Sequence, residues 1–172
     1  MCLLVGVLIA MPVTNPRKWW RRGLVWFLLV VLLFWLGIIF MPSAIPENLG
    51  VIEGKLRECP DSPNCVSTEA TDASHLIPRI EFTGTAADAR ARLIRVVKEM
   101  PRTKLVTEKE NYLHFECRSR LFSFVDDLEF FIDSDTRMIQ VRSASRIGYS
   151  DLGVNRARVN QVRDAFDSRN AQ

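Results

Sequence analysis

The stretch from Leu24 to Met41 limits what this chain can fold into more than any other feature. It reads LVWFLLVVLLFWLGIIFM and contains no charged side chain and no polar group other than two indoles. As a helix, about 18 such residues extend roughly 27 Å, close to the hydrocarbon thickness of a bilayer. The sequence therefore predicts a transmembrane helix over residues 24–41.

The residues before this stretch indicate its orientation. The run Arg17-Lys18-Trp19-Trp20-Arg21-Arg22 precedes it, and basic residues stay on the cytoplasmic side while tryptophans favour the interface. Residues 1–23 are therefore predicted to be cytoplasmic and the C-terminal part extracytoplasmic, which means periplasmic in a Gram-negative cell. A cleaved signal peptide is the alternative, but its apolar region is typically about 7–15 residues long and ends in small residues. This stretch ends in Phe40-Met41-Pro42.

The first residues, Met1 to Val13, are also apolar. About 13 residues are too few to span a bilayer. Translation that begins at Met11 is the simplest explanation, and an interfacial segment is the alternative. In either case the sequence predicts a single spanning helix.

The charge is distributed unevenly. Of the 23 Lys and Arg side chains, the four before Met41 are Arg17, Lys18, Arg21 and Arg22, and all 20 acidic residues follow Met41. The formal net charge of +3 thus comes from the membrane-flanking run, while the remainder is close to neutral. A nucleic-acid partner is not expected, because it would require a basic face on the folded part.

Hydrophobic periodicity divides the remaining chain into a linker over residues 42–58, a domain over 59–168 and a tail over 169–172. In the linker, Pro42, Pro46, Gly50 and Gly54 interrupt any regular pattern. One helix is expected from a cap at Thr85, with Asp88 as its capping partner, to Pro101, and a second from about Asp151. Apolar alternation predicts strands near residues 77–83, 104–107, 112–119, 122–133 and 138–146.

This order of elements predicts an α+β fold. Consecutive strands with short connections favour an antiparallel sheet, and two helices can cover one of its faces. We therefore expect an N-terminal transmembrane helix followed by a two-layer domain, with about five antiparallel strands and both helices on one face. The opposite face is then free of helices, and the sequence leaves open whether residues 48–70 cover it.

The cysteines allow three interpretations. Cys59 and Cys65 bracket the short loop CPDSPNC, and outside the cytoplasm a disulfide between them is the expected state. Free thiols are the second interpretation. A metal site is the third and least expected, because the spacing differs from that of structural zinc sites. Cys117 alternates in phase with Leu113 and Phe115, which predicts a buried thiol.

No catalytic motif is present. The chain contains only His75 and His114, and it lacks the HExxH, GxSxG, P-loop and GxGxxG patterns. We therefore expect neither a cofactor nor a catalytic metal.

Strand phase places charged residues on the face opposite the helices. In the strand near 122–133, Asp127 and Glu129 point away from the core, and in the strand near 138–146 Arg142 and Arg146 do the same. A two-residue turn at Ser134-Asp135 would pair Asp127 with Arg142 and Asp126 with Ser143. A four-residue loop would shift this register but keep the same parity. A third strand adds Tyr112, His114, Glu116 and Arg118 to the same face.

This polar face has three interpretations. It can be a solvated surface with cross-strand ion pairs, or a ligand face on which Arg142 and Arg146 clamp an anion while Asp127 and Glu129 hold them in place. The third interpretation is an acid–base or metal site built from carboxylates. The neighbouring Asp126 faces the core instead, where a carboxylate needs a partner. A buried polar node with Ser143, or with Arg156 or Arg158, is the expected solution.

Three segments of the sequence resemble the domain of unknown function 1499 family. They are CPDSPNCVST at 59–68, FVDDLEF at 124–130 and VRSASRIGYSDLGVNRARV at 141–159, and the likeness extends from about Cys59 to Phe166. Thr68 stands where a second serine is expected. The resemblance implies a bacterial or plastid envelope protein and carries no established activity. It also implies that the family signature includes residues Asp126, Asp127, Arg142, Arg146, Asp151, Asn155 and Arg156.

These observations lead to one hypothesis and one alternative. The hypothesis is a membrane-anchored, non-enzymatic binding or envelope-structural module whose polar face meets an anionic small molecule or an envelope protein. The alternative is a carboxylate-based hydrolase, with or without a divalent metal. The candidate ligand-binding residues are Asp127, Glu129, Arg142, Arg146, Asp151, Asn155 and Arg156.

Overall fold

The computed structural model describes residues 16–39 and 45–168, which fall into two units that divide after Met41. The first unit contains helix α1 (Pro16–Ile39). Its segment Trp19–Gly37 is long and apolar enough to cross a membrane. The helix includes the whole basic and tryptophan-rich run, and this segment includes the last four residues of that run. The predicted end of the spanning segment, at Met41, lies outside the described residues.

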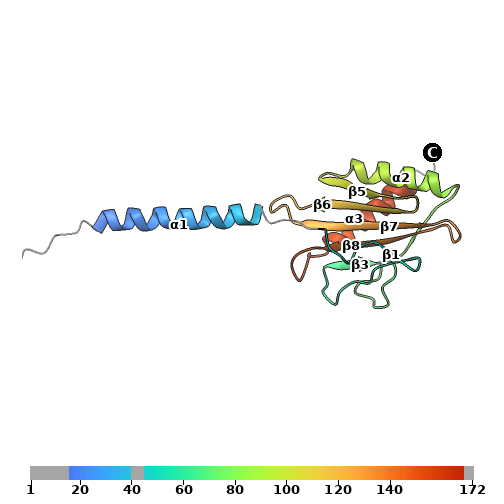
Figure 1. Cartoon of the computed structure of the whole chain (residues 1–172), viewed down its shortest axis with the longest axis horizontal. Helices are drawn as coiled ribbons and strands as arrows, with labels where there is room; N and C mark the ends of the chain where they lie inside the picture. The colour runs from blue at the N-terminus through green and yellow to red at the C-terminus, as the bar shows by residue number, and fades with distance from the viewer. Residues whose placement is uncertain (1–15, 40–44, 169–172) are drawn as a thin grey trace, which may run out of the picture. The chain divides into compact units, whose positions relative to one another are not determined.

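The second unit is an α+β domain whose elements follow in a simple order (Figure 1). Six strands form one sheet in which neighbouring strands pair antiparallel, with the order β3-β8-β7-β6-β5 and β4 paired to β8. The strands of this sheet are β3 (Cys65–Ser67), β4 (Ile80–Glu81), β5 (Thr103–Glu108), β6 (Tyr112–Arg118), β7 (Val125–Asp133) and β8 (Met138–Ser145). The predicted fold class is confirmed, with six strands in place of five.

The additional strand, β3, lies in a segment that sequence periodicity did not mark. It pairs with the C-terminal half of β8, from Cys65 opposite Ala144 to Ser67 opposite Arg142. Strand β4 pairs with the other end of β8, where Ile80 lies opposite Ile139. The two short strands therefore cover successive parts of the same edge of β8.

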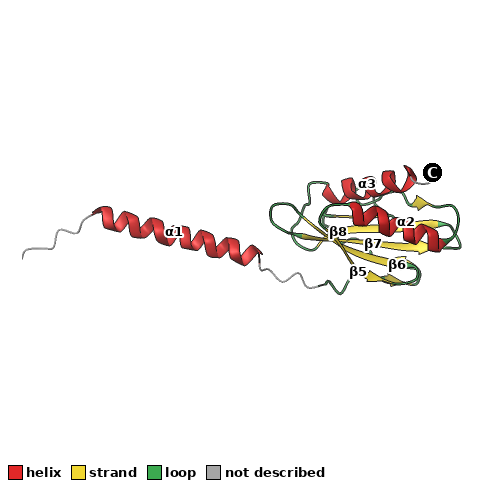
Figure 2. Ribbon diagram, turned by 90° about the horizontal axis from the view of Figure 1, so that it is seen from above, coloured by secondary structure: helices red, strands yellow, loops and turns green. Residues whose placement is uncertain are grey.

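Helices α2 (Ala86–Glu99) and α3 (Val154–Ser168) lie together on one face of the sheet (Figure 2). Helix α2 begins at the predicted cap, because the Thr85 hydroxyl accepts a hydrogen bond from the Asp88 amide. The core lies between helices and strands and includes Leu93 of α2, Phe166 of α3, and Phe115 and Phe130 of the sheet. Its strand residues alternate in the predicted phase.

The turn between β7 and β8 determines the register of the central strands. Asp133 lies opposite Met138, so residues 134–137 form a four-residue loop. The Asp133 carboxylate accepts hydrogen bonds from the amides of Asp135 and Thr136 and stabilises this loop. The two-residue turn predicted at Ser134-Asp135 is therefore wrong, and the four-residue alternative with unchanged parity is confirmed.

The stretch expected to be a linker contributes to the folded domain. It contains the two-stranded antiparallel sheet of β1 (Val51–Ile52) and β2 (Lys55–Leu56). Strand β2 contacts β7 and β8, and Leu56 is buried while Ile52 is half exposed. Since Gly54 also accepts a hydrogen bond from Gln140, an outward residue of β8, the β1–β2 hairpin covers the sheet face that carries no helices.

The predicted disulfide is confirmed. Cys59 and Cys65 are joined with Cα atoms 5.7 Å apart, and Cys117 is a buried free thiol, as its phase predicts. The bridge closes the CPDSPNC loop directly before β3. A loop of this size adds about 2–2.5 kcal/mol by restricting the unfolded chain.

The packing of the hairpin leads to a stability prediction. Leu56→Ala in the full chain is expected to lower the free energy of unfolding by about 2 kcal/mol, because it removes buried apolar surface between the hairpin and the sheet. Ile52→Ala, in the same hairpin but half exposed, should stay within about 0.5 kcal/mol of wild type. Chemical denaturation followed by circular dichroism checks this. Equal effects of the two substitutions would mean that the hairpin does not pack on the sheet.

Candidate functional site

The side chains of β6, β7 and β8 that point away from the helices form a buried polar layer. Phase correctly predicts which residues it contains, but not that they are covered. Glu129 is 0% exposed and Arg142 is 2% exposed. Buried charges are costly unless they are paired and hydrogen-bonded. The other buried members are Tyr112, His114, Glu116, Asp127 and Gln140.

Glu129 and Arg142 form the centre of this layer. They lie directly opposite each other on β7 and β8, and Arg142 Nη1 donates to Glu129 Oε2 at 2.8 Å. The other carboxylate oxygen, Oε1, accepts from the Tyr112 hydroxyl at 2.8 Å and from the Gly50 amide at 2.7 Å. Glu129 thus links β6 and β8, through Tyr112 and Arg142, to the N-terminal segment that contains Gly50.

A second cluster in the same layer is built around Asp127. Arg146 binds this carboxylate in a bidentate manner, with Nε 2.9 Å from Oδ2 and Nη2 2.6 Å from Oδ1. Arg146 Nη2 also donates to Glu116 Oε1 at 2.9 Å, and His114 Nε2 lies 2.7 Å from Asp127 Oδ1. Since an ionised carboxylate only accepts hydrogen bonds, Nε2 of His114 is the donor.

The electrostatics of this cluster favour the charged forms. Burial raises the pKa of Asp127, but the hydrogen bonds from Arg146 and His114 outweigh it, so this pKa lies below its ordinary value. The hydrogen bond to Asp127 likewise raises the pKa of Arg146. Asp127 therefore remains ionised, which suits an ion-pair partner and does not suit a general acid.

The predicted pairings are replaced by others because the register is shifted by the four-residue loop. Asp127 lies opposite Ala144 and is bound by Arg146, whereas Arg142 is bound by Glu129. In the same way, Asp126 lies opposite Ser145 and not Ser143.

Asp126 belongs to a separate polar cluster on the helix-covered face. Its carboxylate accepts from the Ser145 hydroxyl at 2.6 Å and from Arg158 Nη2 at 2.6 Å. Ser143 instead donates to the side-chain oxygen of Asn155. The adjacent residues Asp126 and Asp127 thus point to opposite faces, and each has its own arginine.

Asn155 connects this cluster to the disulfide loop. It is fully buried, and its amide nitrogen donates to the backbone oxygen of Asn64 and to the Ser145 hydroxyl, each at 3.0 Å. The interaction fixes α3, β8 and the end of the CPDSPNC loop in one place. No sequence pattern indicates the role of Asn64, apart from its position next to Cys65.

The structure does not bring all seven candidate ligand-binding residues together. Asp127, Glu129, Arg142 and Arg146 share the polar layer, while Asn155 lies on the other face. Asp151 accepts hydrogen bonds from the backbone amides of Gly153 and Asn155 at the start of α3. Arg156 donates to the carbonyls of Ser74 and Leu76 and holds that loop in place.

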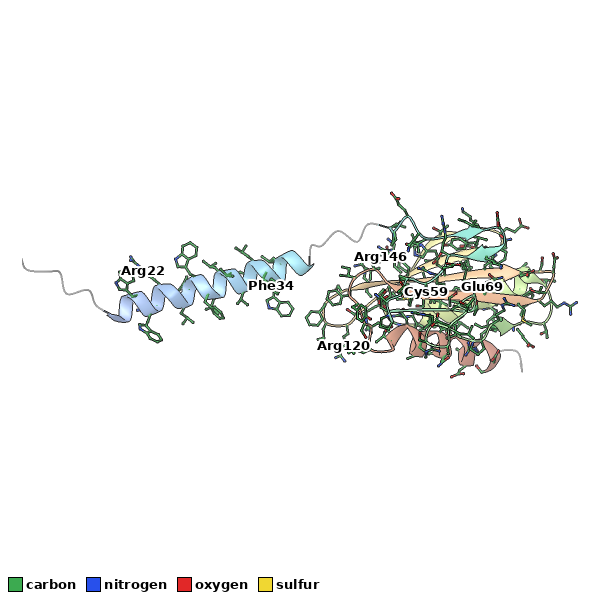
Figure 3. The ribbon with its side chains drawn as sticks, turned by 90° about the horizontal axis from the view of Figure 1, so that it is seen from below. Arg22, Phe34, Cys59, Glu69, Arg120 and Arg146 are labelled. Carbon is green, nitrogen blue, oxygen red and sulfur yellow. A yellow bond between two sulfur atoms is a disulfide. The ribbon has the colours of Figure 1, made fainter. Side chains whose placement is uncertain are left out.

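A hollow of about 280 Å³ lies above the arginines of the polar layer. Asp127, Arg142 and Arg146 line its sheet side, and residues from the entering chain and the disulfide loop line the other, including Pro46, Asn48, Leu49, Ser62 and Asn64. Figure 3 labels Arg146 and Cys59 on this part of the domain. The buried Nε of Arg142 has no hydrogen-bond partner among the described residues.

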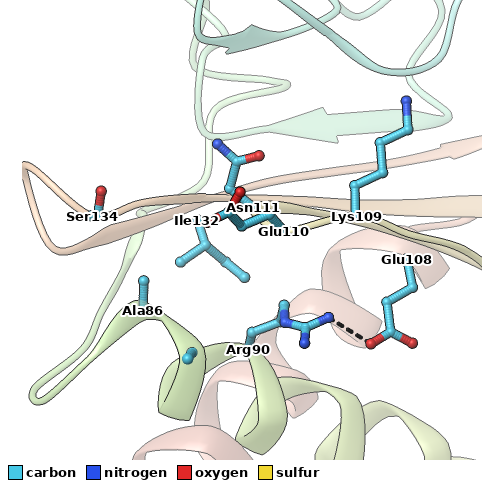
Figure 4. Close-up of a pocket in the computed structure, with 9 residues that line it drawn as sticks. Ala86, Arg90, Glu108, Lys109, Glu110, Asn111, Ile132 and Ser134 are labelled. Atoms are coloured by element: carbon cyan, nitrogen blue, oxygen red, sulfur yellow. Dashed lines mark hydrogen bonds and ion pairs between the residues drawn. The ribbon is translucent and has the colours of Figure 1, made fainter.

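A larger hollow, of about 700 Å³, lies elsewhere, between the start of α2, the β5–β6 turn and the end of β7 (Figure 4). Its charged groups include Arg90 and Glu108, which form an ion pair with each other. Both side chains are partly exposed to solvent. This hollow therefore lacks the buried donor that distinguishes the site above Arg142. The described residues contain no group of three or more His, Cys, Asp or Glu side chains that could hold a metal ion.

Comparison with known proteins assigns the chain to a family. The family described as "Protein of unknown function (DUF1499)" matches residues 55–166. These residues include β2, the disulfide loop and the charged side chains of both polar clusters. The chain therefore belongs to this family, as the sequence resemblance predicts. A search of the curated proteins found no match.

The central ion pair leads to a prediction for a double-mutant cycle. Arg142→Gln is expected to lower the free energy of unfolding by about 3 kcal/mol or more, because it leaves Glu129 buried without its cation. Glu129→Gln in the same chain should recover part of this loss, and the difference measures the coupling. Denaturant titration of the single and double variants gives these values.

The exposed pair Arg90–Glu108 is the matched control for this cycle. Its Arg90→Gln variant should change the free energy of unfolding by less than about 1 kcal/mol, since solvent screens the pair. If Arg142→Gln is equally mild, the polar layer is not buried as described.

Proposed function

We propose that the chain is a membrane-anchored binding protein, with α1 as the anchor and the domain outside the cytoplasm. In this proposal the domain binds a small ligand through the hollow above Arg142. The ligand carries a carboxylate or another acceptor group with at most one negative charge. The observations that carry the proposal are that Arg142 lines the hollow and that its buried Nε–H has no acceptor among the described residues.

The proposed location is supported by three features. The apolar length of Trp19–Gly37 suits a spanning helix, and the basic run at its N-terminal end suits the cytoplasmic side. The disulfide Cys59–Cys65 suits an oxidising compartment. Together these features support an N-terminus inside and a domain outside.

The charge of the site supports a ligand with low charge. The carboxylates of the layer already have cationic partners, because Glu129 pairs with Arg142, Asp127 with Arg146, and Glu116 with both Arg146 and Arg118. A multiply charged phosphate would bring negative charge for which this paired set has no spare cation, whereas a carboxylate or carbonyl can accept from Arg142 without disturbing the existing ion pairs. Among the anionic ligands expected from the sequence, the site therefore favours those with at most one negative charge.

A binding role fits the site better than hydrolysis. A general acid requires a carboxyl group that keeps its proton near neutral pH, whereas the pKa of Asp127 is lowered by its donors. Glu129 already accepts from Arg142, Tyr112 and Gly50. Neither carboxylate therefore favours the hydrolase alternative.

The Nε–H of Arg142 gives a direct test by NMR. In the full chain in nanodiscs, titration with sodium acetate at constant ionic strength should shift this resonance along a saturating curve, and sodium phosphate should shift it less. Arg163 is the internal control, because its Nε is also buried without a partner among the described residues and it does not line the hollow. If both resonances move alike, or neither moves, the ligand proposal is wrong.

A further inference from the structure

Exposed apolar side chains gather at one end of the domain. Leu121 is 80% exposed, Tyr149 is 76% exposed and Leu152 is 94% exposed. The other members of this group, all more than a third exposed, are Phe122, Phe124, Ile147 and Val154. Only Ile45, Ile52 and Leu76 are comparable elsewhere among residues 45–168.

These side chains lie on neighbouring loops. The β6–β7 loop, residues 119–124, and the β8–α3 loop, residues 146–153, begin where adjacent strands end, because the Arg146 amide donates to the Val125 carbonyl at 3.0 Å. In the first loop the rings of Phe122 and Phe124 stack with centroids 5.4 Å apart. In Figure 1 both loops lie at the same end of the sheet. We call this group the apolar end.

The opposite end of the sheet has a different surface. There the β5–β6 and β7–β8 turns consist of polar and charged residues, Lys109-Glu110-Asn111 and Ser134-Asp135-Thr136-Arg137. Most of these side chains are exposed. The contrast between the two ends indicates that the apolar end meets something other than water, since a grouped exposed apolar surface marks an interaction site.

The composition of the apolar end fits a lipid surface. Arg118 and Arg120 directly precede Leu121 and Phe122, and Figure 3 labels Arg120 at this end of the domain. Arg118 also pairs with Glu116, and its side chain is 43% exposed. Basic side chains next to aromatic and aliphatic ones are typical of interfacial membrane binding, where the cations meet anionic headgroups and the apolar groups enter the boundary below them.

The path of the chain supports lipid over other occupants. Pro46 shares the hollow above Arg142 with Gly148, which stands between Ile147 and Tyr149 in the apolar end. The chain thus enters the domain at this end. From Ile39, the last residue of α1, to Pro46 the chain can extend at most about 25 Å. An anchor in the bilayer therefore keeps this end near the membrane surface.

We propose that the apolar end docks on the surface of the bilayer that α1 crosses, with Leu121, Tyr149 and Leu152 at headgroup depth and Arg118 and Arg120 against anionic headgroups. The proposal goes beyond ligand binding and rests on α1 being the anchor. Docking would hold the hollow above Arg142 close to the membrane, because Gly148 lines this hollow and also lies in the β8–α3 loop of the apolar end.

Depth measurement by spin labelling tests this docking. The full chain carrying Cys2→Ser is placed in nanodiscs of phosphatidylcholine and phosphatidylglycerol, with one label at Ser150→Cys in the apolar end or at Asp135→Cys in the β7–β8 turn. Burial raises the pKa of the Cys117 thiol to about 11, so Cys117 stays protonated and unlabelled at neutral pH. The accessibility of each label to oxygen and to an aqueous nickel chelate gives its depth.

The label at residue 150 is expected to favour oxygen, and the label at residue 135 to favour the chelate. Leu121→Ser with Leu152→Ser should move the label at 150 into the aqueous class without unfolding the domain, because both side chains are exposed. Equal aqueous accessibility at 150 and 135 in the otherwise unchanged chain would overturn the docking proposal. Dipolar broadening at 150 that disappears on dilution with unlabelled chain would also overturn it, in favour of contact with a second copy.

A third label separates this proposal from the anchoring on which it rests. At Leu29→Cys, within α1, the label should show the highest oxygen accessibility of the three. If the label at 29 is in lipid and the label at 150 is in water, docking fails while anchoring stands. If the label at 29 is itself aqueous, the anchoring fails.

Discussion

The ion pair between Glu129 and Arg142 is the interaction on which the rest of the domain depends. Both side chains are almost completely shielded from water, and removing two charges from water costs several kcal/mol for each ion. The pair is tolerated because Glu129 also accepts from Tyr112 and Gly50. Since Gly50 belongs to the segment before the sheet, this carboxylate requires that segment to fold over the strands.

The remaining contacts of that segment follow the same logic. The hairpin that contains Leu56 packs on β7 and β8, and the disulfide Cys59–Cys65 fixes the chain where it turns into β3. Asn155 then binds the carbonyl of Asn64 from the other side of the sheet. The domain is therefore a sheet between two covers, helices on the apolar face and the N-terminal segment on the polar face.

Strand phase was sufficient to predict much of this arrangement. The alternation of apolar residues predicts the fold class and separates Asp126 from Asp127, because parity does not depend on loop length. The ion-pair partners of these carboxylates could not be predicted from parity. They depend on the four-residue loop at 134–137, which the Asp133 side chain stabilises, and this loop assigns Arg146 to Asp127 and Arg142 to Glu129.

The cover could not be predicted from periodicity at all. Prolines and glycines between Pro42 and Gly54 are typical of a linker, and β1, β2 and β3 have at most three residues each. Their stability comes from single buried side chains such as Leu56 and Val66, from backbone hydrogen bonds and from one buried carboxylate, and segments this short leave no apolar periodicity in the sequence. For the same reason, the sequence did not show that the N-terminal segment covers the charged face of the strands.

Hydrogen exchange at the Gly50 amide tests the account most directly, because this amide donates a hydrogen bond from the N-terminal segment to Glu129. In the full chain it should exchange orders of magnitude more slowly than a free peptide, as buried strand amides do. Glu129→Gln should accelerate exchange at Gly50 and leave the central amides of α2 unchanged. Exchange at the free-peptide rate in the unmodified chain would show that residues 45–56 are a linker and that the polar layer is open to water.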